Sequence, residues 1–310
     1  MPRKVLIGFG VDADAASGWI GSLGAENSPV DVSRGIYAGE VGIPRLLRLF
    51  AKYNIKTTWF IPGHSLETFP EQMAAVRDAG HEIGLHGYLH ERQSKLTVEQ
   101  QKDVLDRAYD VLTKFNNGVP PKGSCAPCWD TTRDSARLLV EKGIEYDHSD
   151  MAHDSQAYYL RIGDDWTKID YKAKAETWMK PLVRGTDTGL VEIPANWYLD
   201  DWPPLIFVRS AGNSSGWVNT RDVEQLWKDM FTYLYRGENF IFPITIHPDV
   251  SGRPHVLMML ERFIDWVNTH DDVQWVRMID MANEFRGRVS PAANAIMPQG
   301  LATWRIKHIS

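Results

Sequence analysis

Residues 4–14 read KVLIGFGVDAD, an unbroken apolar run that ends in two aspartates, Asp12 and Asp14. A continuous run of this kind, without alternating polar residues, is typical of a strand that is buried on both faces of a parallel sheet. We therefore expect a fold built on parallel strands, with polar side chains placed where this strand ends.

Similar strand-length runs recur along the chain, at residues 55–63, 82–87, 123–127, 144–150, 190–196, 239–248 and 273–280. Helix-like segments alternate with them, at residues 39–54, 67–80, 96–116, 131–143, 219–237 and 254–270. About seven β-then-α units without a repeat period predict a (β/α) barrel rather than a solenoid.

The expected domain organisation is a single barrel without a linker. The barrel is expected over residues 1–289, interrupted by an aromatic-rich loop insertion around residues 155–219. Loops of that length are often functional. Residues 290–310 show no clear pattern, and we expect a C-terminal tail that folds over the barrel or contributes to homo-oligomer contacts.

Composition and charge exclude several classes of partner. The formal net charge is −6, and the basic residues are scattered along the chain, so a nucleic-acid-binding surface is not expected. No stretch approaches the ~20 apolar residues that a membrane span requires. The N-terminal run has no secretory cleavage pattern, so we expect a cytoplasmic protein without a membrane partner.

Polar residues follow three of the expected strands. Asp12 and Asp14 follow the first strand, His86 and His90 (HGYLH) follow the third, and His247 (ITIHPDV) follows a late one. Because strand ends converge on one face of a (β/α) barrel, we expect these side chains to lie together.

The gathered residue types fit metal-assisted hydrolysis of an amide. One carboxylate and two imidazoles form a three-ligand set that leaves a position open for water. A second carboxylate can accept the proton of that water, and a further histidine can protonate the leaving nitrogen. The combination predicts a hydrolase of carbon–nitrogen bonds.

Other polar clusters are expected to be structural. His81 begins a strand and should lie at the opposite end of the barrel, and HEIGL is not the H-E-x-x-H motif of zinc proteases. Residues 147–154, DHSDMAHD, are expected to form a solvated loop, with a second site or a substrate-contacting loop as the alternatives.

The two cysteines, Cys125 and Cys128, lie in SCAPCWD. No second pair exists to complete a four-cysteine zinc site. We expect two buried thiols in a loop rather than a redox pair.

GVDAD, HGYLH, IPANWYLDDWP and IHPDVSGRP together resemble the motifs of the polysaccharide deacetylase superfamily, also called NodB-homology or carbohydrate esterase family 4. The resemblance covers roughly residues 4–285. It looks closest to the branch that holds Helicobacter-type peptidoglycan deacetylases, cyclic imide hydrolases and allantoinase-like proteins. It implies a distorted, incomplete (β/α) barrel of the NodB-homology type.

Carried over position by position, the resemblance implies one divalent metal ion, with zinc as the first expectation and cobalt, nickel or manganese as alternatives. The implied metal ligands are Asp14, His86 and His90. The resemblance makes Asp12 the general base and His247 the general acid, steered by Asp200 or Asp201.

The resemblance also implies aromatic pocket residues and one departure from the family pattern. The residues expected at the substrate are Trp197, Tyr198, Trp202, Pro127, Trp129 and Arg253. Cys125 stands where the family's third motif usually carries an arginine that orients the base. Either Arg253 contacts Asp12 in place of that arginine, or the basicity of Asp12 is set in a different way. The departure bears on whether the protein acts on the family's usual sugar substrates.

The leading functional hypothesis is therefore N-deacetylation of an amino sugar of the chitin or peptidoglycan type, with a small-molecule or oligosaccharide substrate. The alternative within the same chemistry is ring opening of a cyclic imide or ureide. More remote alternatives are an iron oxygenase with two histidines and one carboxylate, and a non-catalytic carbohydrate-binding protein.

Overall fold

The computed structural model describes residues 4–209, 216–237 and 239–301. Within them, nine strands form one sheet whose neighbours run in the order β6-β7-β5-β4-β3-β2-β1-β8, with β9 also pairing with β1. The strands are β1 (Val5–Asp12), β2 (Thr58–Ile61), β3 (Glu82–Leu85), β4 (Gly123–Ser124), β5 (Tyr146–Asp147), β6 (Tyr158–Ile162), β7 (Thr186–Glu192), β8 (Phe240–Ile246) and β9 (Val273–Trp275).

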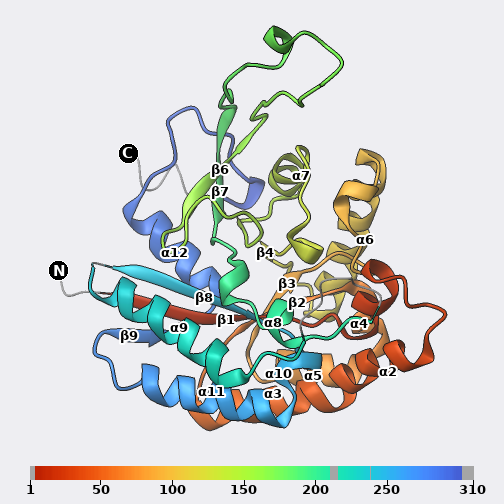
Figure 1. Ribbon diagram of the computed structural model, residues 1–310, viewed down its shortest axis with the longest axis vertical. Helices are drawn as coiled ribbons and strands as arrows, with labels where there is room; N and C mark the ends of the chain where they lie inside the picture. The colour runs from red at the N-terminus through yellow and green to blue at the C-terminus, as the bar shows by residue number, and fades with distance from the viewer. Residues whose placement is uncertain (1–3, 210–215, 238, 302–310) are drawn as a thin grey trace.

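All neighbouring strands run parallel except β6 and β7, which are antiparallel. The sheet curls without closing, because β6 and β8 stand at the two ends of the strand order (Figure 1). This confirms the expected incomplete (β/α) barrel. It also brings the carboxyl ends of β1, β3 and β8 to one face of the molecule.

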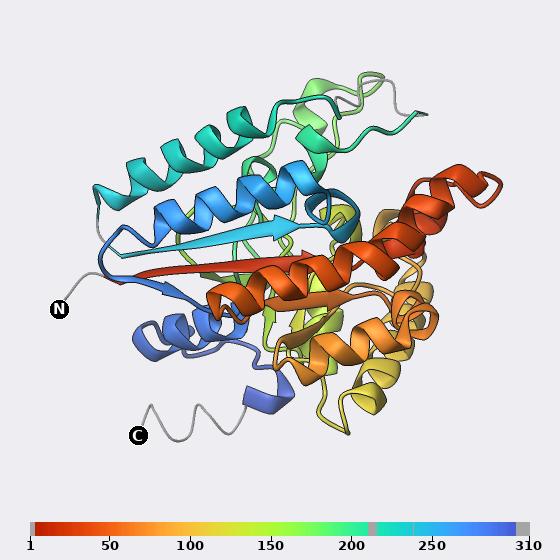
Figure 2. The same ribbon diagram turned by 90° about the horizontal axis from the view of Figure 1, so that it is seen from below.

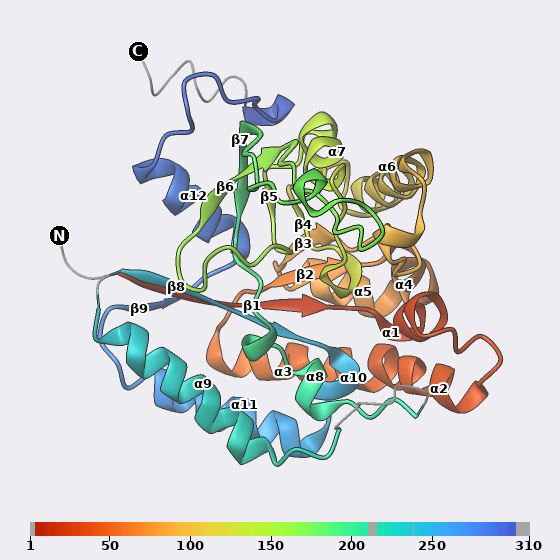
Figure 3. The same ribbon diagram turned by 45° about the horizontal axis from the view of Figure 1, so that its top comes forward.

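Twelve α-helices surround the sheet within the described residues. They are α1 (Ala15–Ser17), α2 (Pro29–Tyr37), α3 (Ile43–Tyr53), α4 (Gly63–Thr68), α5 (Pro70–Asp78), α6 (Val98–Phe115), α7 (Ser135–Lys142), α8 (Trp202–Leu205), α9 (Thr220–Tyr235), α10 (Pro248–Ser251), α11 (Pro254–Val267) and α12 (Met278–Arg288). Helices α3, α9 and α11 lie along the outer side of β1 and β8 (Figures 2 and 3). None of the described helices combines the length and the apolar character that crossing a bilayer would require.

Strand β1 runs through the core and determines the face of the sheet on which Asp12 lies. All eight of its residues are buried. Val5, Ile7 and Phe9 belong to the larger apolar cluster, whereas Leu6 belongs to a second cluster that contains Met278 and Met281 of α12. Because side chains alternate along a strand, the final even-numbered residue, Asp12, shares the face of Leu6.

Strand β8 borders β1 along its length, from Val5↔Phe240 to Val11↔Ile246. The opposite side of β1 is divided between β9 and β2. Pro243 lies inside β8, where it removes a backbone donor, and β8 tolerates it because it is an end strand with β1 as its neighbour.

Two expected elements are corrected. The expected strand at residues 273–280 ends at Trp275, because Arg277 and Asp280 form a capping box that begins α12. The expected loop insertion contains an antiparallel pair, β6 with β7, whose register shifts between Tyr159 and Arg161. Residues 210–215 of the insertion lie outside the described residues.

The first part of the expected tail lies against β7. Ile296 pairs with Thr188, its backbone N–H donates to Asp187, and its carbonyl accepts from Gly189. Residues 302–310 of that tail lie outside the described residues.

Candidate active site

The residues that follow β1, β3 and β8 meet in one buried place. Asp12 ends β1 and Asp14 follows it, while His86 and His90 come after β3 and His247 comes directly after β8. Their exposed fractions range from 1% for His86 to 7% for Asp14 and His247. Three segments that are far apart in sequence therefore supply one cluster, as the parallel-strand reading predicts.

Asp14, His86 and His90 form one close group within the cluster. His86 Nε2 lies 3.2 Å from Asp14 Oδ1, and His90 Nε2 lies 3.2 Å from Asp14 Oδ2. One donor atom from each of the three residues lies within 4.8 Å of the others. The geometry resembles a three-ligand metal site with its donor atoms turned inward.

The second ring nitrogen of each histidine is held by a neighbour. His86 Nδ1 donates to the Cys125 carbonyl at 2.7 Å. Ser22 Oγ donates to the His90 carbonyl at 2.6 Å, so it accepts from His90 Nδ1 at 2.6 Å. With the protons on Nδ1, both Nε2 lone pairs are free for a cation, an arrangement common among metal-binding histidines.

Unsatisfied polar atoms and charge also fit a cation at this place. Asp12 Oδ1, Asp14 Oδ1 and His86 Nε2 are buried without a hydrogen-bond partner. Burial lowers the pKa of His86, but Asp12 and Asp14 outweigh it and raise this pKa to about 9. The site thus favours an added positive charge, which a divalent ion supplies.

The backbone around the cluster adopts unusual conformations. Ala15, His90, Cys128 and Trp129 all have positive φ, at 47°, 58°, 55° and 49°. Non-glycine residues rarely adopt this region, and its concentration around one cluster is typical of functional sites. A single π-helical turn, Gly18–Ser22, ends at the serine that holds His90.

Asp201 orients His247. Its Oδ1 lies 2.8 Å from His247 Nδ1, and its carboxylate also accepts the His247 backbone N–H and the Ser251 hydroxyl. His247 Nε2 then lies 3.8 Å from Asp12 Oδ2 and 3.9 Å from Asp14 Oδ2. Burial lowers the pKa of His247, but the bond to Asp201 prevails and raises it well above its usual value, which favours the doubly protonated, cationic ring.

Asp200 plays a different part from its neighbour. Its Oδ1 lies farther from His247 Nδ1, at 3.6 Å, and accepts the Trp202 backbone N–H at 2.8 Å. Burial raises the pKa of Asp200 to about 8. Of the two aspartates left open by the sequence, Asp201 is the one in hydrogen-bond contact with His247.

A cavity of 430 Å³ opens onto these groups. Three of the expected substrate residues, Trp129, Trp197 and Trp202, line it, and the rings of Trp129 and Trp197 meet edge to face at 4.5 Å. Tyr198 is not among the lining residues and is 67% exposed. Pro127 belongs to a neighbouring, much smaller cavity.

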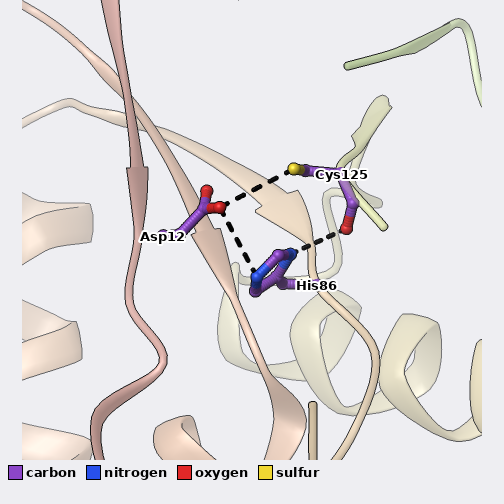
Figure 4. A group of neighbouring side chains, drawn as sticks. All are labelled: Asp12, His86 and Cys125. Atoms are coloured by element: carbon purple, nitrogen blue, oxygen red, sulfur yellow. Dashed lines mark hydrogen bonds and ion pairs between the residues drawn. The ribbon is translucent and has the colours of Figure 1, made fainter. Parts of the chain in front are cut away.

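Cys125 is the group that reaches Asp12 in place of an arginine. Its Sγ lies 3.8 Å from Asp12 Oδ2, and Figure 4 shows Asp12, His86 and Cys125 converging. Burial and the nearby Asp12 raise the pKa of the Cys125 thiol well above its usual value, so this neighbour is neutral. Arg253 instead stacks on Tyr37 and donates to the Asp249 carbonyl.

Two minor expectations about buried groups are wrong. Cys128 is exposed and lines the catalytic cavity, whereas Cys125 is buried; both thiols are free. Within residues 147–154, Asp147 and His148 are buried and not solvated. His148 donates through Nδ1 to the Ile193 carbonyl at 2.7 Å and meets the Thr245 hydroxyl through Nε2 at 3.0 Å.

Sequence reasoning missed several residues of the pocket wall, chiefly Trp19, Leu23, Arg92 and Asp249. Trp19 Nε1 donates to Asp249 Oδ2 at 3.2 Å, which joins the segment after β1 to the segment after β8. The one signal in the sequence was the HPD order that places Asp249 two residues after His247. Trp19 carries no spacing signal of its own.

His81 is structural, as expected from its place before β3. Its Nδ1 accepts the Thr57 backbone N–H at 3.1 Å and lies 3.0 Å from the Thr57 hydroxyl. The ring contacts Phe50 and Trp59 in the larger apolar cluster.

The chain is similar to known polysaccharide deacetylases. The family model described as polysaccharide deacetylase matches residues 36–146. The peptidoglycan deacetylase of Helicobacter pylori is 50% identical over 289 residues, which cover 93% of this chain and 98% of that protein. The peptidoglycan deacetylase-like protein FGM2 of Gibberella zeae is 41% identical, over 91% of this chain and 87% of that protein.

Solved structures show the same fold. A crystal structure from Mycobacterium smegmatis, assigned to the polysaccharide deacetylases, is 29% identical with a TM-score of 0.79 and covers 93% of this chain and 92% of its own. The PuuE allantoinase structure, at 21% identity, has a TM-score of 0.73 over 93% of each chain. The sheet is thus the incomplete barrel of the NodB-homology type.

Proposed function

Because the chain belongs to the polysaccharide deacetylase family, we propose that it is a metal-dependent hydrolase that removes the N-acetyl group from an amino sugar of the peptidoglycan or chitin type. The observation that carries the proposal is the buried group Asp14–His86–His90 beside Asp12 and beside His247, which Asp201 holds in place.

The metal is proposed from the donor set of this chain. Asp14, His86 and His90 would hold one divalent ion, zinc first, with cobalt, nickel or manganese as alternatives. When bound, such an ion lowers the pKa of water and polarises a carbonyl group.

Asp12 and His247 supply the proton transfers. Asp12 Oδ2 faces both His86 Nε2, at 3.6 Å, and His247 Nε2, at 3.8 Å, so it is placed to take the proton of an attacking water. His247 Nε2 gives its proton to the nitrogen as the carbon–nitrogen bond breaks. Water and amide then become a carboxylate and an amine, and Asp201 keeps the ring of His247 oriented throughout.

The pocket suits a sugar ring. Trp129, Trp197 and Trp202 offer flat apolar faces, while Asp249 offers a buried acceptor for a hydroxyl or amide N–H. The cavity of 430 Å³ is of the size that binds a small molecule or a short stretch of oligosaccharide.

One observation favours a second candidate, ring opening of a cyclic imide or ureide. Cys125 gives Asp12 a neutral neighbour where the family pattern has an arginine, and Arg253 makes its contacts elsewhere. The same water attack and the same protonation by His247 would open a cyclic amide, so the two candidates differ in substrate and not in machinery.

A two-arm product assay on metal-reconstituted protein separates the candidates. One arm measures acetate and free amine from N-acetylglucosamine oligomers, and the other follows ring opening of succinimide, hydantoin and allantoin. Asp14→Ala serves as the control in both arms. Acetate release that Asp14→Ala abolishes supports deacetylation; ring opening without acetate release supports the second candidate and contradicts the first.

A further inference from the structure

A second cavity, of 660 Å³, opens beside the catalytic pocket. Trp129 lines the catalytic pocket, whereas Thr131 and Thr132 line the second cavity, so one short segment separates the two. Tyr158 and the half-exposed ring of Trp166 form part of its wall. None of its lining residues takes part in the proposed hydrolysis.

Three carboxylates gather at this cavity. Asp147 and Asp150 line it, and Glu192 is the strand partner of Asp147 in the pairing of β5 with β7. Asp147 is 3% exposed and Glu192 is fully buried. Asp147 Oδ1 and Glu192 Oε2 are both buried without a hydrogen-bond partner.

No cation neutralises these three groups within the described residues. The two guanidinium groups of the cavity are already used: Arg133 pairs with Asp165 at 2.9 Å, and Arg161 pairs with Asp164 at 2.6 Å. Glu192 Oε1 accepts the Ser149 and Asp150 backbone N–H groups, and Asp150 Oδ1 accepts the Thr131 hydroxyl. These hydrogen bonds are to neutral groups, so burial of the three carboxylates remains costly unless a positive charge or a proton offsets it.

The arrangement of the carboxylates does not favour a bare metal ion. Among the described residues, the sets whose donor atoms all lie within 4.8 Å of one another do not include Asp147, Asp150 and Glu192. A metal ion needs its oxygen ligands gathered closely around it. An ammonium group needs fewer charged ligands: two carboxylates can accept its N–H donors at about 2.8 Å, and a hydroxyl or carbonyl oxygen can accept the third.

We propose that this cavity binds the primary ammonium group of an amino sugar, as found in a polymer unit that has already lost its acetyl group. Asp147 and Asp150 accept its N–H donors, and the ring of Tyr158 flanks the sugar, whereas the guanidinium of Arg133 covers the ring of Trp166 at 4.3 Å. The identity of the sugar rests on the proposed function, whereas the recognition of an ammonium group rests on the cavity alone.

The protonation of the empty cavity is consistent with this role. Burial raises the pKa of Asp147 to about 7 and that of Glu192 well above its usual value. Protons thus take the place of the cation when no ligand is bound. A bound ammonium group would displace them.

The test is a calorimetric titration of the metal-loaded protein with a β-1,4-linked glucosamine tetramer, which has no acetyl group to hydrolyse. We expect binding that Asp147→Asn and Asp150→Asn each weaken by roughly tenfold or more, the effect of losing a charge-assisted hydrogen bond. Asp154→Asn is the matched control, because its side chain is 67% exposed on the same loop and does not line the cavity.

Unchanged affinity of Asp147→Asn and Asp150→Asn for the glucosamine tetramer would overturn the inference. It would show that a bound proton alone compensates the buried charge of these carboxylates. If Asp147→Asn fails to fold, the affinity of Asp150→Asn for the tetramer decides between the two outcomes, because Asp150 is less buried and its replacement disturbs the fold less. Because the titration involves no turnover, absence of acetate release together with variant-sensitive binding would contradict the proposed function and leave this inference standing.

Discussion

His247 and Asp201 are joined twice: the imidazole Nδ1 lies 2.8 Å from Asp201 Oδ1, and the backbone N–H of His247 donates to the same carboxylate. The Ser251 hydroxyl donates a further hydrogen bond to Asp201 Oδ2. The pair fixes both the direction and the charge of the ring, so that Nε2 faces Asp12 with a proton to give.

Asp201→Asn should therefore lower kcat by roughly 100-fold or more, the usual contribution of a general acid, without changing the metal content. The amide cannot hold His247 as a cation. Steady-state kinetics and metal analysis of the same preparations provide the measurement.

Asp200→Asn is the matched control for that variant. Burial raises the pKa of Asp200 to about 8, so the side chain is already mostly neutral at pH 7 and its replacement should cost much less activity. Equal losses in Asp200→Asn and Asp201→Asn would contradict the assignment of Asp201 as the orienting partner.

Replacement of Asp12 and replacement of Asp14 should have different effects on metal content, although the two residues are only two positions apart. Asp14→Ala should lose both metal and activity, because Asp14 faces both His86 Nε2 and His90 Nε2 at 3.2 Å. Asp12→Asn should keep one equivalent of metal and lose turnover. Full activity in Asp12→Asn would show that another group accepts the proton.

The two cysteines should differ sharply toward a thiol reagent. Cys128 is exposed, whereas Cys125 is 1% exposed with a raised pKa caused by burial and Asp12. Iodoacetamide should label Cys128 in the native protein and Cys125 only after denaturation, as peptide mass spectrometry can measure. Labelling of Cys125 at a comparable native rate would contradict the burial on which its contact with Asp12 depends.

His81 should make stability depend on pH below neutrality. Burial, with a smaller contribution from Lys56, lowers the pKa of His81 to about 4. Between pH 6.5 and 4 the unfolded chain binds a proton that the folded protein does not, so the free energy of unfolding falls as the pH decreases. The loss should approach about 2 to 3 kcal/mol at the lower end, allowing for partial solvent contact.

The measurement for His81 is urea unfolding from pH 7.5 to 4.5. His81→Gln should flatten the decline by removing the titrating group, even if it lowers stability at every pH. His255→Gln, a replacement of an exposed histidine, should leave the pH dependence unchanged. If the free energy of unfolding of His81→Gln falls with decreasing pH as steeply as that of the original protein, His81 is not the source of the pH dependence.

The parallel strands and the cluster at their ends were predictable from sequence because both depend on simple regularities. A fully apolar run such as residues 5–11 is stable only when both faces are covered, and parallel strands place their ends together. Asp12, Asp14, His86, His90 and His247 follow such runs directly, and the structure brings all five together.

Features set by a single backbone turn or by tertiary packing were not predictable. The choice between Asp200 and Asp201 depends on the contact of this segment with Thr245 of β8, which no local pattern reveals. Cys128 is exposed and has a positive φ, and neither property can be seen in the stretch SCAPCWD. Burial of Asp147 depends on β7, a strand almost 40 residues later in the chain.

The most direct test of the central claim is a metal titration of protein stripped by chelation, with acetate release from N-acetylglucosamine oligomers as the readout. Activity should rise with added zinc and level off at one equivalent, and His86→Ala and His90→Ala should neither bind that equivalent nor recover activity. Undiminished acetate release by the stripped protein, or stoichiometric metal in His86→Ala, would contradict a metal-centred site at Asp14, His86 and His90.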